Sequence, residues 1–264
     1  MGKIIAIANQ KGGVGKTTTC VNLAASMAAT KRKVLVIDLD PQGNATMGSG
    51  VDKYEVAYSA YDLLIDELPL DQVVEVETTG GYHLVAANSD VTAAEVKLME
   101  FFARETRLRS ALANYKDNYD YIFIDCPPSL NMLTVNAMTA ADSVLIPMQC
   151  EYYALEGLTA LVDTISKLAS VVNSGLKIEG ILRTMYDPRN RLCSDVSDQL
   201  KKHFGEKVYR TIIPRNIRLA EAPSFSTPVM YYDKNSSGAK AYLALAGEIL
   251  RREEKLEQQS VSTV

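Results

Sequence analysis

The stretch Lys11-Gly12-Gly13-Val14-Gly15-Lys16-Thr17-Thr18 decides the fold of this 264-residue chain. It follows an apolar, strand-like run, Ile4–Ala8, and precedes a helix-like run, Thr17–Ala29. A strand, a glycine-rich loop and a helix in this order are the context that a phosphate-binding loop requires. Glycines let backbone N–H groups turn toward phosphate oxygens, and the start of the helix adds unpaired N–H groups and a positive dipole end. The stretch therefore predicts a site for the phosphates of a nucleotide.

Two lysines distinguish this loop from the common phosphate-loop pattern. Lys16 is expected to reach the β- and γ-phosphates, and the Thr17 hydroxyl to ligate magnesium. The common pattern has a glycine where this chain has Gln10, and a second lysine, Lys11, begins the loop here. A solvated basic turn is the simpler alternative. It does not explain why glycines gather between two lysines, directly between a strand and a helix, so we favour the phosphate site.

Composition and charge narrow the classes of protein to which the chain can belong. Its length suits one large α/β domain or two small ones, and 47% hydrophobic residues supply a sizeable core. We find no signal-peptide pattern and no apolar run of membrane-spanning length, and we expect a cytoplasmic protein. The net charge of −4 does not indicate nucleic-acid binding, although a local basic patch can still bind phosphate.

The cysteines give no sign of a disulfide framework or a metal cluster. They are scattered and form no C-x-x-C pair: Cys20, Cys126, Cys150 and Cys193. This spacing is typical of buried, reduced thiols.

Apolar runs alternate with helical segments along most of the chain. The expected strands are Ile4–Ala8, Val34–Ile37, Tyr82–Ala86, Tyr121–Ile124, Val144–Met148, Ile178–Met185 and Thr211–Ile213. The expected helices are Thr17–Ala29, Thr92–Tyr115, Leu155–Val172, Asp195–Phe204 and Ala239–Lys255. This pattern predicts a doubly wound α/β fold, in which helices flank a mostly parallel sheet. No linker divides the chain, so we expect one domain over residues 1–264, with a polar tail that frays from about residue 256.

Two acidic segments follow apolar strands. The first is Asp38-Leu39-Asp40-Pro41-Gln42-Gly43-Asn44, in which Asp40 is placed to orient an attacking water, directly or through magnesium. In the second, the apolar strand Tyr121–Ile124 ends in Asp125, a Walker B pattern that supports magnesium. Alone, the first segment is better explained as a turn, and the second is only moderately specific because aspartates at strand ends also occur as helix caps. Together with the phosphate loop, they predict a nucleoside triphosphatase.

These motifs resemble those of the ParA/Soj-type chromosome-partitioning ATPases, the deviant-Walker branch of the P-loop NTPases in the ParA/MinD superfamily. The matching segments are Lys11–Thr18, Asp38–Asn44, Ile124–Ser129, Gln149–Gly157 and Ile213–Ser224. The resemblance extends from Lys3 to about Leu250, and the last two segments are similar to the chromosomal ParA branch. It implies ATP and Mg²⁺ as cofactors and a slow, partner-stimulated hydrolysis of ATP.

The resemblance also implies roles for individual residues. ATP is sandwiched between two subunits, where Lys11 reaches the partner's nucleotide and Gly12 lies at the close approach of the subunits. The implied catalytic residues are Lys11, Lys16 and Asp40, and the implied metal ligands are Thr17, Asp40 and Asp125. The implied nucleotide-binding residues are Lys11, Gly12, Gly13, Val14, Gly15, Lys16, Thr17 and Thr18, with Thr184, Met185, Pro214 and Asn216 at the adenine.

The partners implied by the resemblance are a second copy of the chain, DNA and a ParB-like centromere-binding protein. The ATP dimer binds DNA without sequence preference on the nucleoid, and hydrolysis stimulated by the ParB-like protein releases it. Arg189 and Arg218 match the DNA-binding positions, and Arg191, Arg215 and Lys240 are further candidates. From the sequence alone, each arginine is better explained as an ordinary surface charge.

Other functions use the same loop. A MinD-like membrane-associated ATPase for division-site placement needs a basic amphipathic C-terminal helix, whereas the chain after Leu250 alternates in charge and lacks aromatic residues. We therefore expect no stable membrane association. An electron-transferring ATPase like the nitrogenase iron protein needs paired cysteines, and Cys126 has no such partner in the sequence. A metabolic enzyme would need a substrate pocket that the sequence does not reveal.

Overall fold

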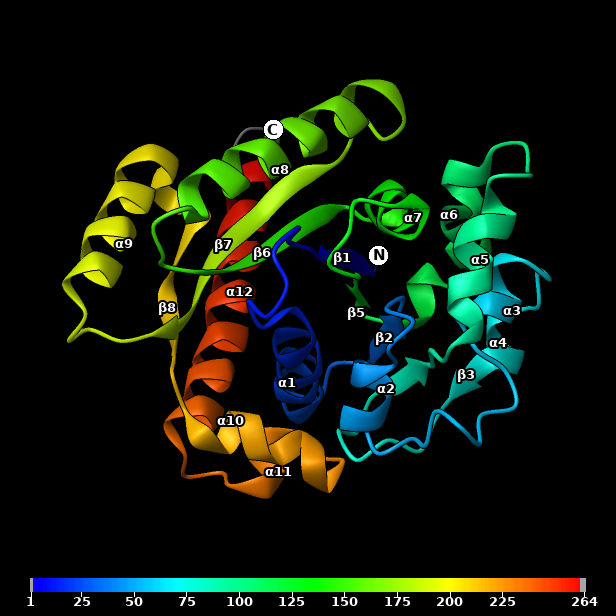
Figure 1. The fold of residues 1–264 in the computed structure, drawn as a ribbon, viewed down its shortest axis with the longest axis horizontal. Coiled ribbons are helices and arrows are strands. Elements are labelled where there is room, and N and C mark those ends of the chain that lie inside the picture. The colour runs from blue at the N-terminus through cyan, green and yellow to red at the C-terminus, as the bar shows by residue number, and fades with distance from the viewer. Residues whose placement is uncertain (1, 262–264) are drawn as a thin grey trace.

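A single eight-stranded sheet forms the centre of the molecule (Figure 1). The computed structural model describes residues 2–261. The strand order is β3-β4-β2-β5-β1-β6-β7-β8, and every neighbouring pair is parallel except β3 and β4. The strands are β1 (Lys3–Ile7), β2 (Val34–Asp38), β3 (Val74–Glu75), β4 (His83–Val85), β5 (Tyr121–Asp125), β6 (Ser143–Gln149), β7 (Lys177–Tyr186) and β8 (Val208–Pro214). The predicted mostly parallel sheet is confirmed.

Helices cover both faces of this sheet. The longer ones are α1 (Lys16–Ala29), α5 (Asp90–Leu98), α7 (Met132–Ala140), α8 (Ala154–Val171), α9 (Arg191–Phe204) and α12 (Ser237–Val261). The shorter ones are α2 (Asn44–Gly48), α3 (Ala60–Leu64), α4 (Leu70–Val73), α6 (Arg107–Leu112), α10 (Ile217–Glu221) and α11 (Val229–Tyr232). Figure 1 shows α5 and α6 at one end of the sheet and α9 at the other. Among residues 2–261, no helix combines the length and the apolarity needed to cross a bilayer.

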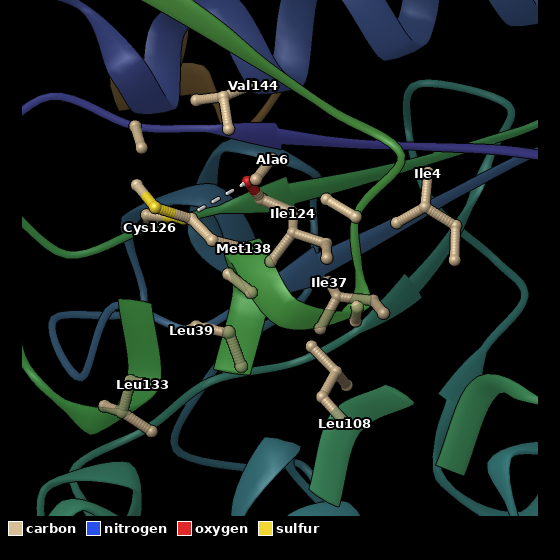
Figure 2. Close-up of a cluster of buried hydrophobic side chains, with 14 of the residues drawn as sticks. Ile4, Ala6, Ile37, Leu39, Leu108, Ile124, Cys126, Leu133, Met138 and Val144 are labelled. Atoms are coloured by element: carbon tan, nitrogen blue, oxygen red, sulfur yellow. Dashed lines mark hydrogen bonds between the residues drawn. The ribbon is translucent and has the colours of Figure 1, made fainter. Parts of the chain in front are cut away.

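The alternation of side chains along each strand divides the core into two clusters. In β1, Ile4 and Ala6 belong to one cluster, whereas Ile5 and Ile7 belong to the other. Helices α3 to α9 close the first cluster, and α1 and α10 to α12 close the second. Figure 2 shows strand residues of the first cluster in contact with helix residues, among them Leu108, Leu133 and Met138. Consecutive apolar residues in the strands are therefore explained by burial on both faces.

The register of the central strands brings the three nucleotide motifs to one edge of the sheet. Strand β5 lies between β1 and β2, and Asp125 at its end pairs with Ile7 on one side and Asp38 on the other. The phosphate loop leaves β1, and the Asp40 loop leaves β2, at the same carboxyl edge. This is where ligands bind in open α/β sheets.

The predicted helix Thr92–Tyr115 is wrong. Helix α5 ends at Leu98, a turn of 3₁₀-helix occupies Arg104–Thr106, and α6 follows. The helical conformation is interrupted at Ala103, which adopts a left-handed φ of 52° and directly follows a fully exposed Phe102. The apolar composition of this segment is typical of one continuous buried helix. In the structure, however, several of its apolar residues face solvent.

The other differences concern short elements and the C-terminus. Helix α6 lies within the predicted helix Thr92–Tyr115, whereas the two-residue antiparallel β3 and helices α2, α3, α4, α7, α10 and α11 are absent from the prediction. They are stabilised by tertiary contacts more than by their own periodicity. The tail expected to fray from about residue 256 is helical to Val261, and residues 262–264 lie outside the described residues. All strands belong to one sheet, which supports the single-domain organisation that we infer.

Candidate nucleotide site at the carboxyl edge of the sheet

The predicted phosphate loop connects β1 to α1. Gly13 and Gly15 have φ values of 73° and 87°, in the left-handed region that favours glycine, and α1 begins at Lys16. Lys16 is buried, and its Nζ donates a hydrogen bond to the Lys11 carbonyl oxygen at 3.2 Å. Burial lowers the pKa of Lys16, and the nearby Asp125 carboxylate opposes that shift. The ammonium group is thus folded back over the loop, where it can donate to a phosphate oxygen.

The ends of β6 and β7 hold this loop in place. Thr184 Oγ1 donates to the Val14 carbonyl oxygen at 2.7 Å, and Gln149 Nε2 donates to that of Gly13 at 3.2 Å. Met185 lies beside the loop as well, since its Cε would be 3.9 Å from a Cβ placed on Gly15. The structure therefore brings Thr184 and Met185, both predicted to lie near the adenine, against the phosphate loop.

The other two residues predicted for the adenine lie after the neighbouring strand. Pro214 ends β8 and pairs in register with Tyr186 of β7. Asn216 caps α10, accepting the N–H of Arg218 at 3.0 Å, while its amide nitrogen donates to Ser237 Oγ at 2.8 Å. The Asn216 side chain thus has a structural role in the described chain, and its contact with a base stays a prediction.

Two fully buried carboxylates lie side by side beneath the loop. Neither oxygen of Asp125 has a hydrogen-bond partner among the described residues. Burial raises its pKa well above the usual range, and the negative charge of Asp38 raises it further. Asp38 Oδ2 accepts hydrogen bonds from Thr46 N at 2.9 Å and Thr46 Oγ1 at 2.8 Å. Burial raises the pKa of Asp38 to about 6 against the effect of these two bonds.

Asp40 lies two residues beyond Asp38, at the start of the loop that leads into α2. Its backbone N–H donates to Asp38 Oδ1 at 3.1 Å, and its own Oδ1 accepts the N–H of Gln42 at 3.0 Å. The side chain is half-buried, in contrast to Asp38 and Asp125. Of Asp38, Asp40 and Asp125, Asp40 is therefore the carboxylate that remains accessible.

The donor set fits a magnesium ion bound together with phosphate. A buried carboxylate without a partner is costly, and the orphaned oxygens of Asp125 are a place where a cation would compensate that cost. Within residues 2–261, no three His, Cys, Asp or Glu side chains are grouped to hold a metal ion by themselves. Magnesium characteristically binds one or two protein groups and takes its other oxygens from phosphates and water. Thr17, Asp40 and Asp125 stay the predicted ligands.

Lys11 and Gly12, predicted to act between subunits, are open to solvent in the monomer. Lys11 Nζ forms an ion pair with Glu151, which follows β6, and about half of each side chain is exposed. A Cβ placed on Gly12 would meet no atom within 4 Å. The monomer itself therefore gives no steric reason for a glycine at position 12.

Sequence reasoning assigned no role to four polar residues that shape the site. Asp38, Thr46, Gln149 and Glu151 all occur within or beside the nucleotide motifs, but only their contacts in the fold show what they do. The position of Asp38, directly before the loop and at the end of a buried strand, was an available signal for it. The contacts of Gln149 and Glu151 span 136 and 140 residues, which no local pattern can reveal.

The two predicted DNA-binding arginines follow the ends of the paired strands β7 and β8. Arg189 is highly exposed and donates two hydrogen bonds to Asp187, at 2.9 and 2.8 Å. These bonds lower the pKa of Asp187 to about 2. Arg218 lies on α10 and forms ion pairs with Glu221 at 2.8 Å and Asp233 at 3.4 Å. Both arginines lie near the β8 edge of the sheet, each close to a carboxylate that partly offsets its charge.

Comparisons with known proteins show the family to which the chain belongs. A family model described as "AAA domain" matches residues 2–178. The sporulation initiation inhibitor protein Soj of Bacillus subtilis is 51% identical over 249 residues, covering 94% of this chain and 98% of that protein. The chromosome partitioning protein ParA of Caulobacter vibrioides is 49% identical over 254 residues, covering 95% of each.

A solved structure that contains a nucleotide is also similar to this chain. The cobyrinic acid a,c-diamide synthase from Mycobacterium smegmatis, with bound ADP and magnesium, superposes with a TM-score of 0.84 at 35% identity and covers 96% of both chains. The chromosome-partitioning ATPase Soj of Treponema pallidum is a further sequence relative, 45% identical over 253 residues and covering 96% of this chain and 99% of that protein. The chain belongs to the ParA/Soj family of chromosome-partitioning ATPases.

Proposed function

We propose that this protein is an ATP-dependent switch that positions DNA. In this cycle, ATP and Mg²⁺ bind at the carboxyl edge of the sheet and drive the formation of an ATP-sandwich dimer. The dimer binds DNA without sequence preference, which places it on the nucleoid. Hydrolysis of ATP to ADP and phosphate is slow until a ParB-like partner stimulates it, and it releases the subunits from DNA.

The observation that carries the proposal is the buried, unpartnered Asp125 carboxylate beside Lys16. Among the described residues, no hydrogen bond of normal geometry reaches the Asp125 oxygens, although the Thr17 hydroxyl lies near enough to lower the pKa of this carboxyl, and Lys16 donates to one loop carbonyl. A magnesium nucleotide supplies what each group lacks, a cation for Asp125 and phosphate oxygens for Lys16. The bound ADP and magnesium of the Mycobacterium smegmatis protein support these ligands for the present chain.

Each residue of the site has its own proposed role in binding or hydrolysis. Lys16 and the loop N–H groups would bind and orient the phosphates, and Thr17, Asp40 and Asp125 would hold Mg²⁺. Bound magnesium supplies positive charge that stabilises the phosphate oxygens. Asp40, the accessible carboxylate, would orient the attacking water in line with the γ-phosphate. Lys11, reaching from the partner subunit, would add a second cation to the same phosphates.

Hydrolysis and assembly measured together test this function. The purified protein should hydrolyse ATP slowly in the presence of Mg²⁺, sediment as a dimer with ATP but not with ADP, and bind unrelated DNA sequences alike. A ParB-like protein together with DNA should accelerate turnover. A protein that does not bind ATP, or that binds DNA equally well without it, would contradict the proposal.

The structure gives a reason to favour DNA over a membrane surface. The apolar face of α12 packs into the core, since Tyr242, Leu245 and Ile249 are fully buried. Farther along the helix, Glu253 pairs with Lys3 and accepts a hydrogen bond from Tyr121. A membrane-binding helix needs a free apolar face. We therefore infer no stable membrane association, and flotation of the ATP-bound protein with anionic vesicles would overturn that inference.

A further inference from the structure

We infer that Thr46 is a positioning residue for ATP hydrolysis, acting through Asp38 on the loop that carries Asp40. The inference rests on the proposed function, because it concerns the orientation of the carboxylate that would position the attacking water. Thr46 lies on α2, outside the phosphate loop.

Three hydrogen bonds join the N–H and the hydroxyl of Thr46 to Asp38 and Ala87, and the residue is fully buried. Its backbone N–H and its hydroxyl both donate to Asp38 Oδ2, at 2.9 and 2.8 Å. The hydroxyl oxygen also accepts the backbone N–H of Ala87 at 2.9 Å. The hydroxyl thus joins the end of β2 to the segment that follows β4.

Through the Asp38 carboxylate, Thr46 also fixes the loop that contains Asp40. Asp38 Oδ1 accepts the Asp40 N–H at 3.1 Å while Oδ2 is held by Thr46. One carboxylate therefore binds the backbone at both ends of the loop. Inside the loop, Gly43 N–H donates to the Asp40 carbonyl at 2.8 Å, which completes the turn.

Close packing reinforces this link. A Cβ on Gly43 would lie 2.6 Å from the Ala87 carbonyl oxygen, so the loop contacts the same residue that Thr46 binds. Replacing the hydroxyl of Thr46 by a methyl group would leave the Ala87 N–H without its acceptor and Asp38 with one donor fewer. The Asp40 backbone would lose its fixed direction, although no group expected to contact the phosphates would be removed.

The test compares Thr46→Val, nearly the same in shape, with Thr46→Ser, which keeps the hydroxyl. Thr139→Val is the matched control, because Thr139 is a buried threonine whose hydroxyl has no partner among the described residues. We expect Thr46→Val to lower kcat roughly tenfold to a hundredfold with little change in KM for ATP, as misplacement of a reacting group does. Thr46→Ser should restore kcat to within about threefold of the wild type, since it can make the same bonds, and Thr139→Val should match the wild type.

Hydrogen exchange supplies a readout that does not require turnover. Thr46→Val should speed exchange of the amides in residues 40–46 relative to the wild type and Thr139→Val. Unchanged kcat in folded Thr46→Val, a rise in KM alone, or a decrease that folded Thr46→Ser shares would overturn the inference. If Thr46→Val does not fold, the kcat of Thr46→Ser alone tests the inference, and a kcat well below that of the wild type would overturn it. A wild-type protein without ATPase activity would instead contradict the proposed function, and unchanged exchange in Thr46→Val would then overturn the positioning role separately.

Discussion

Lys11, at the start of the phosphate loop, forms an ion pair with Glu151, which lies just beyond the end of β6. In the proposed dimer, the same lysine must extend to the nucleotide of the other subunit. Glu151 and the partner's phosphates would therefore compete for one ammonium group.

Glu151→Gln should release Lys11 and favour the ATP dimer. Exposed ion pairs contribute about 1 kcal/mol or less, and two of them are broken in each dimer, so the dimer dissociation constant should fall by up to about thirtyfold. Sedimentation across a concentration series with ATP would measure it. Glu156→Gln, an exposed glutamate on α8, is the control. A weaker dimer would show instead that Glu151 acts in the interface itself.

Lys16→Ala should abolish productive ATP binding. The substitution removes a buried cation that is expected to donate charge-assisted hydrogen bonds to the phosphates, each contributing about 1.5–3 kcal/mol. Calorimetric titration with Mg-ATP would measure the weakened affinity, and the variant should remain monomeric and off DNA. Undiminished ATP affinity would show that this segment is not the phosphate-binding loop.

Asp40→Ala should separate ATP binding from hydrolysis. The contacts of the loop with phosphate would persist, while the attacking water would lose its orienting group, a role that contributes about 10²–10⁴ in rate. The ATP-loaded dimer should accumulate and stay on DNA, as measured by single-turnover hydrolysis and by release from DNA. Asp52→Ala, which removes an exposed carboxylate that accepts a backbone N–H outside the site, is the control. Wild-type turnover in Asp40→Ala would contradict this role.

Gly12→Val should keep ATP binding and remain monomeric. The added side chain meets no atom of its own subunit near the Cβ, so the thermal stability of the monomer should be unchanged. In the dimer, the same side chain would occupy the proposed close approach between subunits. Sedimentation with ATP would distinguish the two states, and a dimer as strong as that of the wild type would refute the close-approach argument.

Arg189→Ala and Arg218→Ala should each weaken ATP-dependent DNA binding, while ATP binding and dimerisation stay intact. Each substitution removes one charge per subunit, and the slope of log K against log salt should become shallower by about 0.9 for each phosphate that is no longer neutralised. Arg109→Ala, an exposed arginine on α6 toward the other end of the sheet, is the control. Titrations of unrelated DNA sequences over a salt series would measure the effect. If both variants bind like the wild type at every salt concentration, the arginines are ordinary surface charges.

Local patterns in the sequence determined the phosphate loop, the central strands and the acids at their ends. Strands buried on both faces need consecutive apolar residues, and a phosphate loop needs glycines between a strand and a helix, so both are visible within a few residues. The resemblance to the family extended this prediction to Lys11, Gly12 and the DNA-binding arginines. The segment 92–115 failed because its apolar residues face solvent around Ala103, and composition does not show where a residue points.

Only the tertiary structure decided which groups hold these motifs in position. Thr184 bonds to Val14 across 170 residues, and Lys11 pairs with Glu151 across 140. The pairing of β2 with β5 places Asp38 next to Asp125, and burial then raises the pKa of both carboxylates. These relationships depend on the order and register of strands that are distant along the chain. The sequence alone therefore predicted the groups that we propose for the chemistry, whereas the fold determined their neighbours, their burial and their charge.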